Sequence, residues 1–217
     1  MTTATSSPRT SPRAVVRIGP SWIQVAALVV AVAFATGALV YFLDHREQSP
    51  NAADIGFIDD MILHHQQAVS MSFAFVRRAD PGQIANTAEE IIMSQSGDLR
   101  MMSRWRVAWP ESDGNEAGTV MAWMSMRRPL QAMPGFAAEA DVAKLGTLTA
   151  RELDDHFTTL MIRHHFGGIH MAEAAEQRVA LDEVRAFARR VVLLQRQEIA
   201  EINLWRASAN LAEINGL

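Results

Sequence analysis

Cysteine is absent from this chain of 217 residues. The protein therefore has no disulfide framework, no thiolate nucleophile and no lipid-modified cysteine. Alternating runs of β-branched residues, which predict strands, are missing too. These absences favour a helical fold, and they limit any metal site to histidine, methionine and carboxylate side chains.

The motifs of several enzyme classes are also missing. The sequence contains no His-Glu-x-x-His motif, no serine in a nucleophile elbow and no glycine-rich phosphate loop. A metal-dependent oxidase stays open as an enzymatic alternative, but the sequence supplies no acid or base for it beyond histidine. We expect that the protein is not an enzyme.

Basic residues are concentrated at the N-terminus. Of the 20 Lys and Arg residues, Arg9, Arg13 and Arg17 lie in the first twenty positions, which contain no acid, and the remaining 17 stand against 24 Asp and Glu residues. Proteins that bind nucleic acid carry a basic patch or stripe. We therefore expect no nucleic-acid partner.

A long apolar run follows this basic segment. Trp22 to Leu43 contains 22 residues without a charge, which is enough to cross a bilayer, and Trp22 and Tyr41 lie where interfacial aromatic residues would lie. Because the basic residues precede the run, the N-terminus is expected in the cytoplasm. We predict a disordered cytoplasmic tail over 1–20 and a transmembrane helix over 21–43 that anchors the chain in the cytoplasmic membrane.

A cleaved signal peptide is the alternative for the same run and would give a secreted protein. The apolar region of a signal peptide is usually about 7–15 residues long. The one Ala-x-Ala match, Ala33-Phe34-Ala35, lies inside the apolar run rather than after it. The sequence thus favours a retained anchor, a polar linker over 44–52 and an extracytoplasmic domain over 53–212.

The residues beyond the linker have a helical pattern. Apolar residues recur at spacings of three and four, and Pro and Gly cluster at 80–82, 110–118 and 133–135. We predict long helices at 53–79, 83–108, 149–178 and 181–212. A shorter helix near 117–127 is expected within the connection.

The two halves of this domain repeat with a constant offset of 100 residues. The identical pairs are Phe57 and Phe157, Met61 and Met161, Ile62 and Ile162, His64 and His164, His65 and His165, Met71 and Met171, Gln95 and Gln195, and Trp105 and Trp205, while Asp98 matches Glu198. Each half is a helical hairpin that cannot bury its apolar stripe alone. We therefore predict an all-α fold in which two hairpins form a four-helix bundle.

The repeated histidines and methionines form the candidate site. Because a helical residue advances by about 100°, the matching positions share one face of their helix, with the small residues Ala68 and Gly168 leaving room between them, while His170 points away. The candidate metal ligands are Met61, His64, His65, Met71, Met161, His164, His165 and Met171.

The donor types in this set favour copper. Thioether sulfur is soft and selects Cu(I), while imidazole also accepts zinc, nickel and iron, so zinc is the second choice. A ferritin-like di-iron site would need Glu-x-x-His motifs, and no Glu stands three residues before any of the paired histidines. Di-iron chemistry is therefore not expected.

Structural roles are the alternative for several of these residues. A methionine stripe is more often core packing than a ligand set, and we expect Met93, Met101, Met121, Met124 and Met126 in the core. We expect His45 and His156 to be solvated. Gln95, Gln195, Trp105 and Trp205 could support the histidines or simply pair structurally. A scaffold whose histidines form a core hydrogen-bond network without metal also stays open, as do self-association and the identity of any protein partner.

The motif Phe57-Ile-Asp-Asp-Met-Ile-Leu-His-His-Gln-Gln-Ala-Val-Ser-Met71, with Gln95 following, resembles the bacterial family called domain of unknown function 305. The segment from Met161 to Met171 matches the motif again, and the resemblance covers about 53–206. It implies a ferritin-like bundle, often exported or anchored, with some members described as periplasmic copper-binding proteins that contribute to copper resistance.

The chain also departs from the family pattern. Met133-Pro-Gly-Phe136 resembles a Met-Pro-Gly-Met segment but ends in Phe, and Ile202 stands where the family has the methionine that Met102 keeps in the first half. Gly97-Asp98-Leu99 replaces an acidic-aliphatic stretch, and a helical glycine costs up to about 1 kcal/mol. The resemblance therefore implies unequal metal binding by the two halves.

Overall fold

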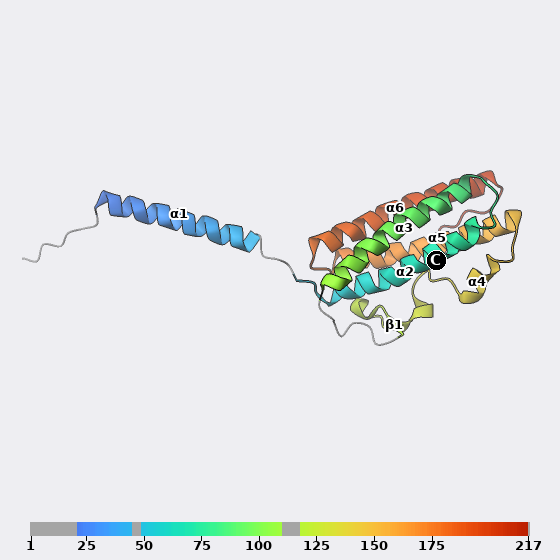
Figure 1. Cartoon of the computed structure of the whole chain (residues 1–217), viewed down its shortest axis with the longest axis horizontal. Helices are drawn as coiled ribbons and strands as arrows, with labels where there is room; N and C mark the ends of the chain where they lie inside the picture. The colour runs from blue at the N-terminus through green and yellow to red at the C-terminus, as the bar shows by residue number, and fades with distance from the viewer. Residues whose placement is uncertain (1–20, 45–48, 110–117, 217) are drawn as a thin grey trace, which may run out of the picture. The chain divides into compact units, whose positions relative to one another are not determined.

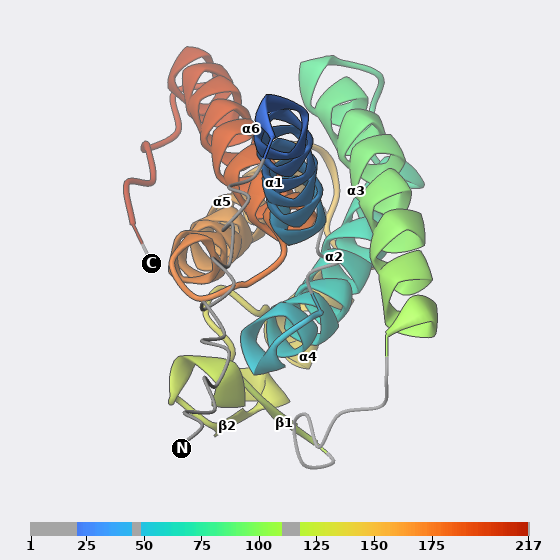
Figure 2. The ribbon, with the colours of Figure 1, turned by 90° about the vertical axis from the view of Figure 1, so that its left-hand side faces the viewer.

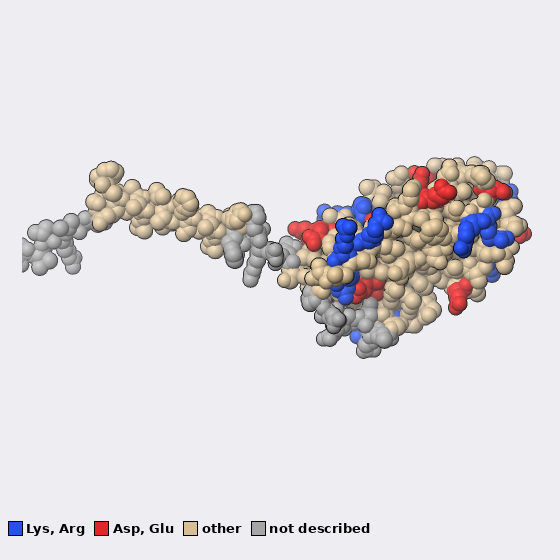
Figure 3. Space-filling view, in the orientation of Figure 1, with Lys and Arg blue, Asp and Glu red and all other residues tan. Residues whose placement is uncertain are grey.

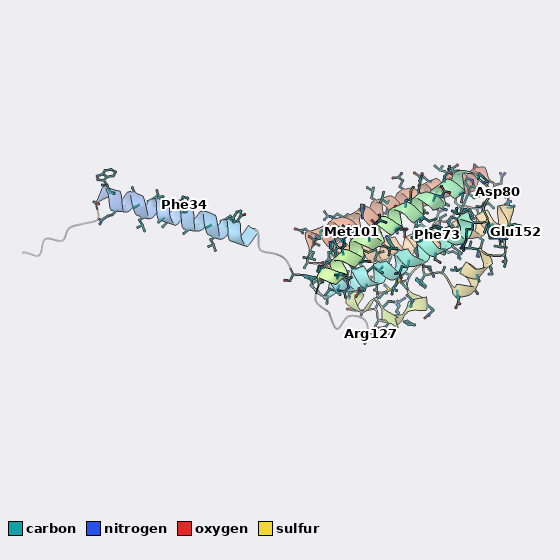
Figure 4. The ribbon with its side chains drawn as sticks, viewed as in Figure 1. Phe34, Phe73, Asp80, Met101, Arg127 and Glu152 are labelled. Atoms are coloured by element: carbon teal, nitrogen blue, oxygen red, sulfur yellow. The ribbon has the colours of Figure 1, made fainter. Side chains whose placement is uncertain are left out.

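The computed structural model describes residues 21–44, 49–109 and 118–216, in two compact units, Met1–Glu47 and Gln48–Leu217. The first unit contains α1 (Trp22–Asp44), whose stretch Trp22–Tyr41 has a mean hydropathy of 2.3. Phe34 projects from this helix, and no charged side chain covers residues 21–41 (Figures 3 and 4). The predicted apolar helix is confirmed, and its length and composition suit a membrane span or a signal sequence. The expected tail over 1–20 and residues 45–48 of the linker, which include His45, lie outside the described residues.

Four long helices make up most of the second unit (Figures 1 and 2). They are α2 (Ala52–Val76), α3 (Gln83–Ala108), α5 (Ala150–Glu176) and α6 (Asp182–Ser208). The all-α prediction is confirmed, and each predicted helix is found within a few residues of its expected ends. Helix α6 ends before 212, since Asn210 adopts a left-handed φ of 54°. The hairpins α2–α3 and α5–α6 meet mainly through α2 and α5. The finer expectation of a ferritin-like four-helix bundle stays a prediction.

Helices α2 and α5 run antiparallel. Phe75 stacks on Phe157 with ring centroids 4.1 Å apart, whereas Phe57, near the start of α2, shares a core cluster with Ala175, near the end of α5. Phe57 packs there against Trp123, 5.6 Å away, from the connection between the hairpins. Equivalent positions of the two repeats therefore meet near the middle of the helix pair.

Asp54 ties the start of α2 to the start of α6. Asn51 caps α2 by accepting hydrogen bonds from the backbone N–H groups of Ala53 and Asp54, and the carboxylate of Asp54 accepts one from the N–H of Asn51. This reciprocal pair is a capping box. The same carboxylate accepts bonds of 3.0 Å from the N–H groups of Ala180 and Leu181. The two hairpins are thus joined at this end by a buried acid.

The prediction of a helix near 117–127 is wrong for residues 118–127, which the structure describes. The connection contains β1 (Thr119–Val120), η1 (Ala122–Met124), β2 (Arg128–Pro129), η2 (Leu130–Ala132) and α4 (Glu139–Lys144). Met121 and Ser125 have φ values of 63° and 58°, which an α-helix does not allow. The buried carboxylate of Asp60 accepts hydrogen bonds from the N–H of Met121 and Nε1 of Trp123, at 2.7 and 2.8 Å. These bonds hold the segment in its non-helical form.

Four of the five methionines expected in the core are buried or partly buried, and the fifth is exposed. Met121 and Met124 are buried, and Met101 and Met126 are partly buried against the core. The expectation for Met93 is wrong, because its side chain is 67% exposed. Ile91 and Gln95 of the same helix are buried, so Met93, at about 200° from each of them, faces solvent.

We predict that Gly167→Ala destabilises the protein by about 1–3 kcal/mol, the usual cost of overpacking. A Cβ at Gly167 would collide with the backbone of Pro134 and lie 2.7 Å from the nitrogen of Gly135. Urea denaturation measures the change. Gly97→Ala is the matched control, since the nearest atom to its Cβ would be 3.9 Å away, and it should stabilise α3 by about 0.5–1 kcal/mol. Equal stability of Gly167→Ala and the parent chain would contradict this packing.

Candidate metal centre

All eight residues of the predicted metal site are buried in α2 and α5, none more than 1% exposed. The rings of His64 and His164 stack at the middle of the helix pair, with centroids 3.6 Å apart and planes at 27°. The ring of His165 lies 6.3 Å from that of His164. The structure therefore brings histidines from both repeats together.

The four methionines flank these histidines on two sides. Met61 and Met171 belong to the core cluster that contains Phe57, whereas Met71 and Met161 belong to the cluster around Phe75 and Phe157. Across residues 21–44, 49–109 and 118–216, no group of three or more His, Asp or Glu side chains is arranged to hold a metal ion. A metal at the centre would thus need thioether ligands or a turn of the rings, and the assignment of the eight ligands stays a prediction.

The ring nitrogens at the centre lack hydrogen-bond partners. Both nitrogens of His64 and His164 are buried without one, as are Nδ1 of His65 and Nδ1 of His165. A buried polar group left unpaired costs about 1–3 kcal/mol, and nearly all such groups in folded proteins are paired. A core hydrogen-bond network, as the scaffold alternative requires, is therefore not formed by these nitrogens.

Burial keeps the stacked histidines neutral. Desolvation lowers the pKa of His64 well below 6.5, and His65 and His165 lower it further. The backbone groups of Pro134 and His164 oppose the shift only in part. Desolvation, followed by the neighbouring histidines, likewise lowers the pKa of His164. Neutral imidazole is the form that binds a metal ion.

Helices α3 and α6 each supply a carboxylate to one histidine. Oδ2 of Asp98 lies 3.5 Å from Nε2 of His65. Oε2 of Glu198 lies 2.6 Å from Nε2 of His165. Carboxylates in such positions orient metal-binding imidazoles. One sequence signal pointed to them, which was the alignment of Asp98 with Glu198 in the repeat.

Glutamines from the same two helices close the centre. Gln95 and Gln195 are 4% and 3% exposed, and Oε1 of each lacks a hydrogen-bond partner. Gly168 leaves space that the side-chain amide of Gln195 fills, since a Cβ there would collide with that amide. Trp105 and Trp205 pack against the two core clusters, and the ring of Trp105 also contacts Trp109 and Phe187.

The Met133-Pro-Gly-Phe136 segment lies against the backbone of α5 at His164. Gly135 has a φ of 72°, and a Cβ there would lie 2.5 Å from the carbonyl oxygen of Arg163. The side-chain amide of Gln67 donates to the carbonyl of Ala137 and accepts from its N–H, at 2.9 and 2.7 Å. Sequence reasoning identified this segment as a break between helices and, through the family resemblance, as a family motif, but it assigned no contact to it. The structure assigns it a packing role beside the stacked histidines.

The other histidines lie apart from the centre. His170 is exposed, as predicted. The expectation for His156 is wrong, since it is half-buried and its Nε2 lies 2.8 Å from the carbonyl oxygen of Asp141 on α4.

A small cavity opens between α3 and α6 and reaches His65. Its lining residues are His65, Ser94, Gln95, Asp98, Val191, Leu194, Gln195 and Glu198. The cavity volume of 20 Å³ is enough for about one water molecule or metal ion. It offers a route from the surface toward the histidines.

Fold and site together define a helical protein that buries paired histidines from two repeats where antiparallel helices meet. The chain belongs to the family described as domain of unknown function 305 (DUF305), whose family model matches residues 54–206. A comparison with functionally curated proteins finds no match.

Solved structures of the family have the same fold. A DUF305 protein from Streptomyces coelicolor, described as a candidate secreted protein, is 34% identical, covers 75% of this chain and 97% of its own, and has a TM-score of 0.67. A DUF305 fragment from Deinococcus radiodurans is 28% identical over 71% of this chain and 95% of its own, with a TM-score of 0.60. CopM in its Cu(II)-bound form is 24% identical over 71% and 96% of the two chains, with a TM-score of 0.54. At that identity the likeness to CopM shows the fold alone.

We predict that acid destabilises the metal-free protein. The pKa of His64 and of His164 is lowered by folding, so the unfolded chain binds more protons once the pH falls below about 6.5. The stability is fully present above that pH and is lost by up to about 1.4 kcal/mol per pH unit for each histidine. Urea denaturation at pH 7.5, 6.5 and 5.5 measures it. The double variant His64→Leu, His164→Leu should have a flatter profile, and identical slopes would contradict the prediction.

Proposed function

We propose that this protein is a membrane-anchored, extracytoplasmic copper-binding protein and not an enzyme. The proposed ligands are the buried residues of the two repeated motifs, Met61, His64, His65, Met71, Met161, His164, His165 and Met171. The observation that carries the proposal is the set of buried, unpaired ring nitrogens from both repeats. A bound metal ion would give several of these nitrogens a partner at once.

The donor chemistry supports copper over zinc. Thioether sulfur favours Cu(I), imidazole accepts both Cu(I) and Cu(II), and no thiolate is available. The stacked histidines are held neutral by burial, so they need not lose a proton to bind. CopM, which shares the fold, has been solved in Cu(II)-bound, Cu(I)-bound and Ag-bound forms, and this supports the same proposal for the present chain.

The proposed location follows from α1 and the charges beside it. Arg9, Arg13 and Arg17 precede the helix, and an excess of basic residues marks the cytoplasmic side of a membrane span. The domain after α1 then lies outside the cytoplasm, where it would bind copper from the extracytoplasmic space.

We predict that α1 is retained in the mature protein. Expression of the full chain with a C-terminal tag, followed by intact-mass measurement, should give the mass of a chain that includes residues 22–44, found in the membrane fraction. A soluble product that begins after α1 would show that the helix is a cleaved signal sequence.

We predict tight, histidine-dependent binding of soft monovalent metals. The full chain in detergent micelles would be titrated with Cu(I), under anaerobic competition with a chromophoric chelator, and with Ag(I). Changing His64, His65, His164 and His165 to Leu should weaken binding by at least about a hundredfold, because loss of even one supporting group costs about tenfold to a hundredfold. Leucine fills the space of the ring without a ligand atom.

His170→Leu is the matched control for this titration, since His170 is exposed on α5, and it should bind like the parent chain. Circular dichroism verifies that each variant is folded. If the four-histidine variant bound Cu(I) and Ag(I) as tightly as the parent, the paired histidines would be structural, and the scaffold role would take the place of copper binding.

A further inference from the structure

The cavity between α3 and α6 is lined by several side chains that can donate an electron pair to a metal ion. Asp98, Gln95 and Ser94 contribute from α3, Glu198 and Gln195 from α6, and His65 from α2. Both glutamine side chains are more than nine-tenths buried, and each has an Oε1 atom without a hydrogen-bond partner. Unpaired acceptors and carboxylates around a volume for one ion favour a bound cation.

The charges at the cavity also favour a cation. Asp98 and Glu198 contribute two negative charges, and the guanidinium of Arg190 lies 2.6 Å from Oδ1 of Asp98. Arg190 also lies over the ring of Phe187, at 5.4 Å, and its side chain is 47% exposed. Arg190 therefore offsets one of the two carboxylates while keeping access to solvent.

We propose that this cavity is a second metal site, which takes a divalent cation of intermediate hardness such as Zn²⁺ or Cu²⁺. Its ligands are the carboxylates of Asp98 and Glu198 and Nε2 of His65, with the amide oxygen of Gln95 or water completing the coordination. Carboxylate and imidazole ligands suit such cations, whereas Cu(I) selects thioethers. The site goes beyond the proposed Cu(I) centre and shares only His65 with it.

In the structure, each of the two carboxylates lies next to a basic side chain. Arg190 pairs with Asp98, and His165 lies beside Glu198. A divalent cation in the cavity competes with both partners and draws the two carboxylates together across α3 and α6.

The repeat offers one such site per chain rather than two. The position equivalent to Arg190 in the first half is Glu90, so only Asp98 receives an arginine from the opposite hairpin. Asp98 and Glu198 both face the same cavity. The expected stoichiometry is thus one divalent cation for each chain.

Zn²⁺ is the probe for the test, because it has no redox chemistry that could shift it to the Cu(I) centre. Isothermal titration of the full chain in detergent should give one saturable Zn²⁺ site. The isosteric double variant Asp98→Asn, Glu198→Gln should bind Zn²⁺ at least about tenfold more weakly. Arg190→Gln should bind it several-fold more tightly, since the competing guanidinium is removed. Glu173→Gln is the matched control, because Glu173 pairs with Arg196 on the surface of α5 and α6.

Ag(I) titration of the same variants separates the two proposals. Arg190→Gln should keep the Ag(I) affinity of the parent chain, because Arg190 pairs with Asp98 and is not one of the eight proposed copper ligands. The four-histidine variant removes His65 from both sites, so its loss of Ag(I) binding tests the copper centre. Absence of a saturable Zn²⁺ site in the parent would overturn the cavity site. So would equal Zn²⁺ affinity in parent and double variant. If the double variant failed to fold, an unchanged Zn²⁺ affinity in Arg190→Gln would overturn it instead.

Discussion

Burial of four imidazoles at the contact between α2 and α5 is the constraint on which the rest of the structure depends. His64 stacks on His164 at this contact, and their ring nitrogens have no hydrogen-bond partner. Folding therefore bears a cost of polar burial that apolar residues at the same positions would not impose. The surrounding core must supply enough stability to hold the rings where a ligand can use them.

Contacts around the histidines supply stability that offsets this cost of polar burial. The aromatic pair Phe75 and Phe157 closes one end of the helix pair, and Asp54 links the two hairpins at the other. The Pro134-Gly135 backbone lies directly on α5, where two glycines permit the approach. On the opposite side α3 and α6 leave a small cavity beside His65. The centre is thus enclosed by backbone on one side and approached through side chains on the other.

The sequence could predict the parts of this arrangement that depend on periodicity. Helix positions, the duplication and the burial of the motif residues follow from spacings of three and four and from the offset of 100. Contacts between helices do not follow from spacing, so the partners of Asp98 and Glu198 were not predicted. The non-helical segment around Met121 depends on a long-range bond to Asp60. Met93 was misassigned because the composition of a helix does not show which of its methionines face solvent.

Trp123 makes the segment between the two hairpins a part of the core. The stacked pair Phe75 and Phe157 joins α2 to α5 at one end. At the other end Phe57 shares its cluster with Ala175, and its ring packs against Trp123 and Phe187, 5.6 and 6.1 Å away. Gly56 provides the space for that indole, since a Cβ there would collide with it. The linking segment has thereby become part of the core. Because Trp123 belongs to neither hairpin, a hairpin separated from the linking segment would expose the face of Phe57 that the indole covers.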